Sequence, residues 1–448
     1  MTDWLDAEAH ADRASEMYER GRWAEAEQEL RHALSLNPDQ PEWHYNLALT
    51  LEAAGRDLEA LGSYERASEL APDQIEPLVA AGAVCNRLQR FKQALAWLDR
   101  ALTLSPASEN AYAQKIAALV WLGDHDEAEA VFYMAQHALD APSAPCLSAI
   151  AESLIERKEY NRAGWCLREA LKLEPRVPRL RARLAAVLAA TGKPQRALQM
   201  YLRDLRDDPG NIDTLLDYGE LLIDLGRFPE AAEKFRRVLE LEPANVDAHY
   251  QLGQIAMASR RFEQAHLEFE LVLKLDPQFP SIRLAVSQAL LKRGYAKMAL
   301  QCLRDELDAW ARDEETTRTA GELERFGTLL LEVGLPDEAA RMCQRAVRSG
   351  GESPGLLRKL ALARFRHGDI DGGVTASRRA LRLDPASTAS IHNLALAALH
   401  AGQLRVAAGW IARGLRVNRH DDGLRRLRIR LWLAWIRSSL AKVFRRRT

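Results

Sequence analysis

The chain has 448 residues, of which 47% are apolar and 28% are charged, a composition typical of a folded protein. Its net charge of −1 is unevenly distributed, because residues 424–448 contain eight arginines and one lysine but no acidic residue. Residues 1–423 therefore contain 53 of the 62 basic residues and all 63 acidic residues, a net charge of −10. The sequence lacks an apolar run long enough to span a membrane, an N-terminal secretion signal, and cysteines spaced for zinc or a disulfide framework, which favours a reducing compartment.

Glycines recur along the chain at intervals of 34 residues, and prolines follow them 17 residues later. A fixed period of this length predicts one small unit that is copied many times. The glycines fall in three registers: Gly21, Gly55 and Gly123; Gly192, Gly226 and Gly294; Gly334, Gly368 and Gly402. The prolines are Pro38, Pro72, Pro106, Pro175, Pro209, Pro243, Pro277 and Pro385.

Twelve units can be placed in chain order. They begin at Ala7, Pro41, Ile75, Glu109, Ser143, Pro178, Ile212, Val246, Pro280, Ala320, Pro354 and Thr388. A one-residue slip precedes the sixth unit, and six extra residues, 314–319, precede the tenth. The array ends near Asp421.

Each unit predicts two helices. Apolar residues at 3-and-4 spacing predict a first helix, helix A, which ends at the glycine. A second helix, helix B, follows and ends before the proline. Position 20 of the unit is almost always alanine, and positions 8 and 27 are often small, which predicts close contact between helices. Position 24 is often aromatic: Tyr64, Phe132, Tyr201, Phe235 and Phe269.

This pattern resembles the tetratricopeptide repeat family over residues 7–421. The resemblance implies an all-α, right-handed superhelical solenoid of about twelve helix-turn-helix repeats, with helix A on the inside. We expect about nine repeats in residues 1–313, an insertion or hinge at 314–319, three repeats in 320–421 and a basic amphipathic helix in 422–448. The weakest units are the fifth, where Arg157 and Lys158 replace the glycine, and the ninth, which lacks the closing proline and predicts a longer helix or a hinge.

Motifs for catalysis or nucleotide binding are absent from the sequence, and the eleven histidines are scattered. The repeats leave no room for a separate catalytic domain. We therefore expect no enzyme activity, cofactor or metal, and we expect protein binding instead.

In the resembled family, helix A positions 2, 5, 6, 9, 12 and 13 face the groove, and some members clamp a peptide's terminal carboxylate there with five residues. Asn46 matches one clamp position, but Ala11, Ser15, Glu76 and Ala80 occupy the others. Arg179 and Arg183 match two further positions, but Ala149 replaces the required asparagine. The sequence therefore argues against this clamp.

Two charged strips mark the expected groove. One contains Arg176, Arg179, Arg181 and Arg183, and the other contains Asp213, Asp217, Glu220 and Asp224 on one face of the next helix A. They predict either recognition of a charged partner segment or pairing of the strips with each other. Tyr250, Gln251 and Gln254 extend the expected wall.

The basic tail allows three interpretations: a capping helix, a helix lying on an anionic membrane surface, or a contact with nucleic acid, which the acidic remainder of the chain disfavours. The contact residues for an anionic surface are Arg428, Arg430, Trp432, Trp435, Arg437, Arg445, Arg446 and Arg447.

The sequence as a whole predicts a cytoplasmic scaffold that binds a peptide or protein segment in its groove. The alternatives are an assembly factor that associates with a membrane surface through its tail, and a regulatory subunit of an enzyme on another chain.

Overall fold

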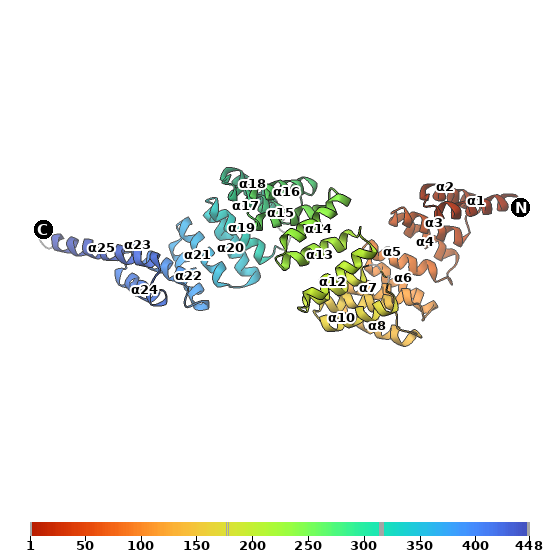
Figure 1. The fold of residues 1–448 in the computed structure, drawn as a ribbon, viewed down its shortest axis with the longest axis horizontal. Helices are drawn as coiled ribbons and strands as arrows, with labels where there is room; N and C mark the ends of the chain where they lie inside the picture. The colour runs from red at the N-terminus through yellow and green to blue at the C-terminus, as the bar shows by residue number, and fades with distance from the viewer. Residues whose placement is uncertain (1, 176, 178, 313–317, 446–448) are drawn as a thin grey trace. The chain divides into compact units, whose positions relative to one another are not determined.

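A computed structural model describes residues 2–175, 177, 179–312 and 318–445, with side chains for 6–175, 177, 179–311 and 318–437. Over this part of the chain the structure contains 25 α-helices and no β-strand (Figure 1). The chain forms two compact units, Met1–Lys234 and Phe235–Thr448. The boundary falls within one helix, α14 (Phe228–Leu241).

The first unit is a succession of helix pairs. In chain order the helices are α1 (Thr2–Glu19) and α2 (Trp23–Leu36), α3 (Pro41–Ala53) and α4 (Asp57–Leu70), α5 (Glu76–Arg87) and α6 (Phe91–Leu104), α7 (Glu109–Leu122) and α8 (His125–Ala138), α9 (Ala144–Glu156) and α10 (Tyr160–Leu173), α11 (Leu180–Ala190) and α12 (Pro194–Asp207), and α13 (Ile212–Asp224), which pairs with α14.

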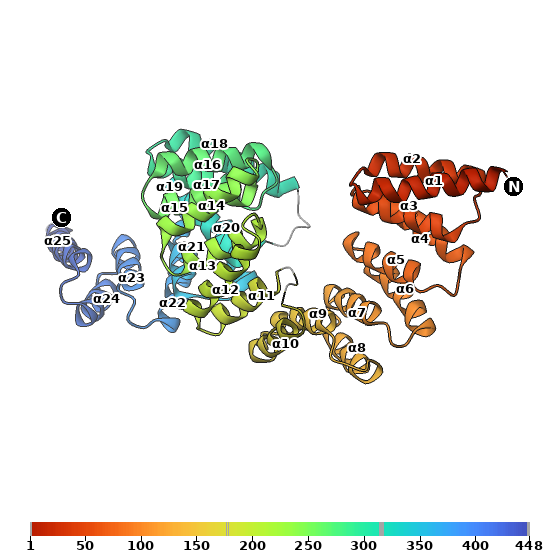
Figure 2. The same cartoon turned by 45° about the vertical axis from the view of Figure 1, so that its right-hand side comes forward.

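The second unit continues the same pattern (Figure 2). Its helices are α15 (Val246–Ala258) and α16 (Phe262–Leu275), α17 (Ile282–Lys292) and α18 (Ala296–Arg312), α19 (Ala320–Glu332) and α20 (Pro336–Gly350), α21 (Pro354–His367) and α22 (Ile370–Leu383), α23 (Thr388–His400) and α24 (Leu404–Val417), and finally α25 (Asp422–Arg445). The prediction of an all-α solenoid built from twelve helix pairs, with a further C-terminal helix, is therefore confirmed.

The turn between helix A and helix B has the same backbone geometry in all twelve pairs. At the turn residue the backbone is left-handed, and the next N–H bonds back to the carbonyl five residues earlier, as in Arg56 N to Leu51 O at 2.9 Å. Nine of these turn residues are glycine, but Gln89, Lys158 and Arg260 adopt the same conformation with φ of 58°, 61° and 58°. The turn geometry therefore persists where the glycine is missing.

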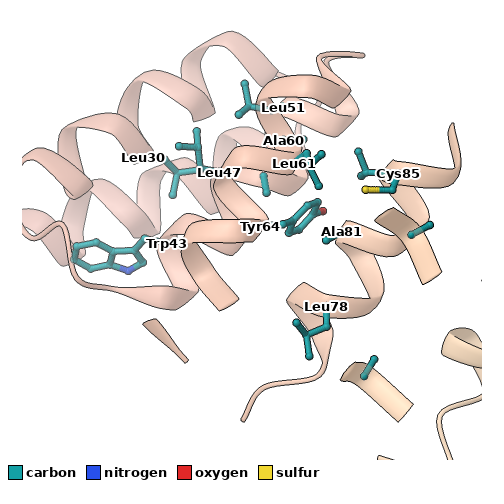
Figure 3. Packing of buried hydrophobic residues seen from close by; sticks show 14 of the residues in the cluster. Leu30, Trp43, Leu47, Leu51, Ala60, Leu61, Tyr64, Leu78, Ala81 and Cys85 are labelled. Atoms are coloured by element: carbon teal, nitrogen blue, oxygen red, sulfur yellow. The ribbon is translucent and has the colours of Figure 1, made fainter. Parts of the chain in front are cut away.

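Small residues let the two helices of a pair approach closely. The ten alanines at position 20, from Ala26 to Ala407, and Ala163, which takes that place in the shifted fifth unit, are all 0% exposed. A Cβ at Gly253, which occupies position 8, would lie 2.4 Å from the Phe269 ring at position 24. Figure 3 shows the same arrangement in the first unit, where Tyr64 of α4 is fully buried beside Ala60 and Ala81. The apolar pattern of the repeat thus forms a core shared by neighbouring pairs.

Neighbouring pairs also contact each other through helix A. Helix α7 contacts both α5 and α9, α11 contacts α13, and α19 contacts α17 and α21. Side chains on successive helices A are consequently close enough to bind one another, which positions the surface described below.

Two helices A depart from the pattern. Helices α11 and α17 have 11 residues each and begin after Arg179 and Ser281, whose φ values are 62° and 57°. The ninth unit has the longer helix that its missing proline allows, since α18 has 17 residues. Trp310 near its end is buried against Phe326, with ring centroids 4.6 Å apart. The expected insertion or hinge at 314–319 falls largely on residues outside the described part, so it stays a prediction, as do the predicted domain limits.

Candidate partner-binding surfaces

Arg183 connects two successive helices A in the first unit. Its Nη1 donates to Ser148 Oγ of α9 at 2.7 Å, and its Nε lies 2.8 Å from Glu152 Oε1 on the same helix. The Arg183 and Glu152 side chains are each 40% exposed. The contact is therefore a half-exposed ion pair that water or a ligand can reach.

Arg179 makes the corresponding connection from α11 to α13. Its Nη1 donates to Asp213 Oδ2 at 2.9 Å, and its Nη2 reaches Asp217 Oδ2 at 3.5 Å. Among the described residues its Nε is buried without a hydrogen-bond partner. We call Arg179, Arg183 and their partners Ser148, Glu152, Asp213 and Asp217 the paired face. The predicted basic and acidic strips thus pair through Arg179, while Arg176 lies outside the described residues.

Asp217 is the least solvated carboxylate of the paired face. Burial raises its pKa above the ordinary value, and Arg179 opposes this shift only in part. Beneath it, Tyr201 is buried and stacks on Tyr218 with ring centroids 5.7 Å apart. Burial, with Asp217 and Glu220 nearby, also raises the pKa of the Tyr201 hydroxyl. Glu220 therefore belongs to the same electrostatic environment.

Asn46 lies apart from the paired face, on α3. It lines a hollow of about 160 Å³ between α1, α2 and α3, which also includes Ser15 and Tyr18. This volume is below the roughly 300 Å³ at which ligand pockets begin. The hollow is thus smaller than a typical small-molecule pocket, and the role of Asn46 in binding a partner stays a prediction.

The remaining groove candidates lie on α15 in the second unit. Tyr250 packs into the core, with its ring 4.9 Å from Phe279 and 5.8 Å from Phe269 between centroids. Gln251 and Gln254 are partly exposed on the same helix. The structure thus groups these three residues together, and it gives Tyr250 a packing role that the sequence pattern did not predict.

Helix α25 presents two different faces. Leu424, Leu427 and Leu431 are buried against α23 and α24, so this end of α25 covers the last helix pair. The side chains of Ile429, Trp432, Leu433, Trp435 and Ile436 are between 37% and 62% exposed. Arg428, Arg430 and Arg437 are exposed beside them. Helix α25 therefore covers the last helix pair with one face and exposes a second face, which contains both arginines and apolar side chains, to solvent.

The side chains of Arg445, Arg446 and Arg447 lie outside the described residues. Across the part of the chain that the structure covers, every helix is too short or too polar to cross a bilayer.

The cysteines show none of the features of catalytic nucleophiles. All five are free thiols, and four of them are buried. Burial raises the pKa of Cys85, Cys146, Cys166 and Cys343 to about 11 in each case, which leaves little reactive thiolate at neutral pH. The described side chains also contain no group of three or more histidine, cysteine or carboxylate residues placed to hold a metal.

Four segments of the chain match profiles of one repeat family. Residues 180–213, 222–289 and 325–388 match profiles described as tetratricopeptide repeat, and residues 14–55 match one described as TPR repeat. The matched segments fall on helix pairs of the predicted period. The chain is a tetratricopeptide repeat protein.

One curated relative matches part of the repeat array. Anaphase-promoting complex subunit 3 of Schizosaccharomyces pombe is 29% identical over 121 residues, which are 27% of this chain and 17% of that protein. The likeness therefore spans less than a fifth of the relative's length.

Solved structures with a similar repeat arrangement include yeast Tom70, with a TM-score of 0.41 at 16% identity over 97% of this chain and 96% of that one. A chain of the APC/C hetero-tetramer Cut9-Hcn1 gives 0.43 at 14% identity, over 93% and 95%. A human IFIT1 dimer with m7Gppp-AAAA gives 0.48 at 17% identity, over 84% and 90%.

The spacing of the tetratricopeptide repeats reveals contacts that the motif search missed. Ser148 and Arg183 are 35 residues apart, Arg179 and Asp213 are 34 apart, and Glu324 and Lys359 are 35 apart. Ser148 and Glu152 were not among the predicted site residues. A search for complementary polar residues separated by one repeat length in successive helices A would have found Ser148, whereas Glu152 lies 31 residues before Arg183 and would have been missed.

Proposed function

We propose that this tetratricopeptide repeat protein is a non-enzymatic scaffold that binds a charged segment of a partner protein across the paired face. The observation that carries the proposal is the chain of ion pairs that joins α9, α11 and α13. These side chains are about 40% to 58% exposed, so their charges can exchange one partner for another at small cost.

The backbone at Arg179 supports this proposal. Its left-handed conformation is disfavoured for a residue with a side chain. Residues held in such conformations occur preferentially at binding sites, where the surrounding structure maintains them. Here the conformation places the guanidinium beside Asp213 and Asp217. A cationic group on a partner segment would compete with Arg179 for these carboxylates, and an acidic group would bind Arg179 itself.

The test begins with a pull-down of the full chain in which the bound proteins are identified. The partner's affinity is then measured for the variant Asp217→Lys/Glu220→Lys. We expect the affinity to change by about ten-fold and its dependence on salt to change as well. A matched control is Glu233→Lys/Glu240→Lys on α14, since these carboxylates are 70% and 62% exposed and the change in net charge is the same. Unchanged affinity for the first variant would rule out the paired face.

If the captured partner is an enzyme, its turnover with and without this chain distinguishes a scaffold from a regulatory subunit. We also propose a cytoplasmic location, which the five free cysteines support.

A second candidate function is docking on an anionic membrane surface through α25. It is favoured by Ile429, Trp432, Leu433 and Ile436, which are exposed although they are apolar, and by the exposed arginines beside them. Tryptophan together with arginine is the composition of helices that lie in the membrane interface.

Deletion of the whole helix would also uncover the core that Leu424, Leu427 and Leu431 cover. The sharper variant is therefore Trp432→Ser/Ile436→Ser, which leaves the docked face intact. Sedimentation with vesicles of phosphatidylcholine, with and without about 30% phosphatidylserine, measures binding. We expect binding only to the anionic vesicles and its loss in the variant. No binding by the native chain, or equal binding by the variant, would exclude this function.

A further inference from the structure

A hollow of about 570 Å³ lies between α10, α11 and α12 in the first unit. All the charged side chains that line it are basic: Arg168, Lys172, Arg181, Lys193, Arg196 and Arg203. We call this site the basic hollow. Six cations without an acid are unusual in a chain whose net charge is −1.

Most of these cations are not neutralised by neighbours. Lys172 pairs with Glu169 at 2.7 Å, and Arg181 pairs with Asp207. In the part of the chain that the structure describes, the side chains of Arg168, Lys193, Arg196 and Arg203 make neither a hydrogen bond nor an ion pair. Arginines elsewhere in this unit behave differently: Arg56, for example, binds both Glu27 and Glu59. The basic hollow therefore keeps an uncompensated positive charge.

The floor of the basic hollow is apolar. Leu184 and Leu188 of α11 lie at its base, with Leu171 of α10 and Met200 of α12 on either side. Leu184 is 4% exposed and Leu188 is 8% exposed. The two walls carry the charges at helical spacing, since Arg168 and Lys172 are four residues apart on α10 and Arg196 and Arg203 are seven apart on α12. The site thus combines an apolar base with a basic rim on both sides.

The apolar floor and the basic rim together indicate which kind of ligand the basic hollow can bind. A rim of unpaired cations attracts carboxylates, and the aliphatic floor gains free energy by covering apolar side chains. A nucleic acid would find phosphate contacts here, but the lining contains no aromatic side chain on which a base could stack. An acidic protein segment with an apolar stripe satisfies both the rim and the floor.

We propose that the basic hollow is a second docking site, which binds an acidic amphipathic helix of a partner protein. The apolar stripe of that helix lies on Leu184 and Leu188. Its carboxylates pair with Arg168 of α10 on one side of the site, and on the other side with Lys193, which precedes α12, and with Arg196 and Arg203 of α12. The site uses a different face of α11 from Arg179 and Arg183, so it is independent of the function proposed above.

The test uses the full chain and a display library of random peptides of about 16 residues, which is roughly four helical turns. We expect the enriched peptides to be acidic and to carry aliphatic residues three and four apart. One enriched peptide, labelled with a fluorophore, then serves as the probe. We expect Arg196→Glu/Arg203→Glu to weaken its binding by about ten-fold or more, and we expect native binding to weaken as the salt concentration rises.

The matched control is Lys92→Glu/Arg236→Glu, which changes the net charge equally at two exposed helical positions outside the basic hollow. Circular dichroism of each variant establishes that it is folded. An absence of enriched acidic peptides, or equal loss of binding in the control, would overturn the proposal.

Two further outcomes would overturn it in favour of a different site or ligand. If the probe's affinity changes in Asp217→Lys/Glu220→Lys but not in Arg196→Glu/Arg203→Glu, the peptide binds the paired face, and the function proposed above gains support instead. If a labelled uridine oligonucleotide binds the native chain more tightly than the peptide and is lost in Arg196→Glu/Arg203→Glu, the hollow binds nucleic acid.

Discussion

The paired face and the basic hollow lie on different faces of the same helix, α11, and both are built around arginine. In the paired face, Arg179 and Arg183 reach carboxylates on α13 and α9. In the basic hollow, Arg168, Arg196 and Arg203 reach none in the described structure. The difference follows from what each neighbour supplies: successive helices A present Asp213, Asp217 and Glu152, whereas the lining contributed by α10 and α12 contains no carboxylate. The same residue type is thus ion-paired within the chain on one face of α11 and unpaired on the other.

Leu184 of α11 lines the floor of the basic hollow and is also buried in the core. Truncation by Leu184→Ala should lower the free energy of unfolding by about 3 kcal/mol, since the side chain is buried and the cavity cannot close completely. Urea unfolding followed by circular dichroism measures the change. Arg183→Ala, on the other face of α11, should cost less than about 1 kcal/mol. Similar losses in the two variants would show that the floor is not packed as described.

Backbone conformation gives the next largest effect. Lys158 is exposed and left-handed, so Lys158→Gly should raise the free energy of unfolding by about 0.5–1 kcal/mol. Arg179 has the same backbone conformation, but Arg179→Gly also removes the contacts to Asp213 and Asp217, so its net gain should be smaller. Thermal unfolding of the two variants tests this order. An equal gain at both positions would mean that the ion pairs of Arg179 contribute nothing to stability.

Removal of charge should have opposite signs on the two faces. Arg179→Gln should lower the free energy of unfolding by a few tenths of a kcal/mol to about 1 kcal/mol, because a paired cation is lost. Arg196→Gln should raise it by a few tenths, because repulsion among unpaired cations is relieved. Both changes should shrink in about 1 M salt. Two changes of the same sign would contradict the distinction between paired and unpaired arginines.

The smallest effect is the titration of Asp217. Because burial raises its pKa in the folded state, the folded chain binds this proton more tightly than the unfolded chain. Its contribution to stability is therefore complete below the unfolded pKa, near 3.9, and is lost as pH rises through the higher folded value. Carboxyl NMR measures the midpoint, and Arg179→Gln should raise it further. A midpoint at or below the ordinary value would refute the burial of this group.

The helix pairs were predictable because the same positions recur in many units. Glycine at the turn marks a left-handed backbone in each pair, and alanine at position 20 marks the close approach of the two helices. The aromatic residue at position 24 marks a packing contact, such as that of Phe269 with Gly253 at position 8. The late starts of α11 and α17 were not predictable, since Arg179 and Ser281 carry no sequence signal for a left-handed conformation. Pairing of the strips was one of two alternatives that the sequence left open. Only the structure shows that Arg179 reaches both Asp213 and Asp217.

The basic hollow was missed for a different reason. Its residues come from three helices and are separated by apolar and neutral positions, so they form no run of charge in the sequence. The spacing of charged residues within one helix predicts a charged face on that helix. A site formed by side chains of two or more helices can be predicted only when the helices that lie side by side are known.

Four of the polar links between successive helices A join residues 34 to 38 positions apart, close to one repeat length. Evolution by gain or loss of a whole repeat would bring new residues into these same positions without disturbing the links on either side. A single-residue insertion within a helix would instead rotate every later side chain of that helix by about 100° and break its links on both sides. The series of linked helices A can therefore change in length most readily by whole repeats, and in the charges it presents by point substitution within a repeat.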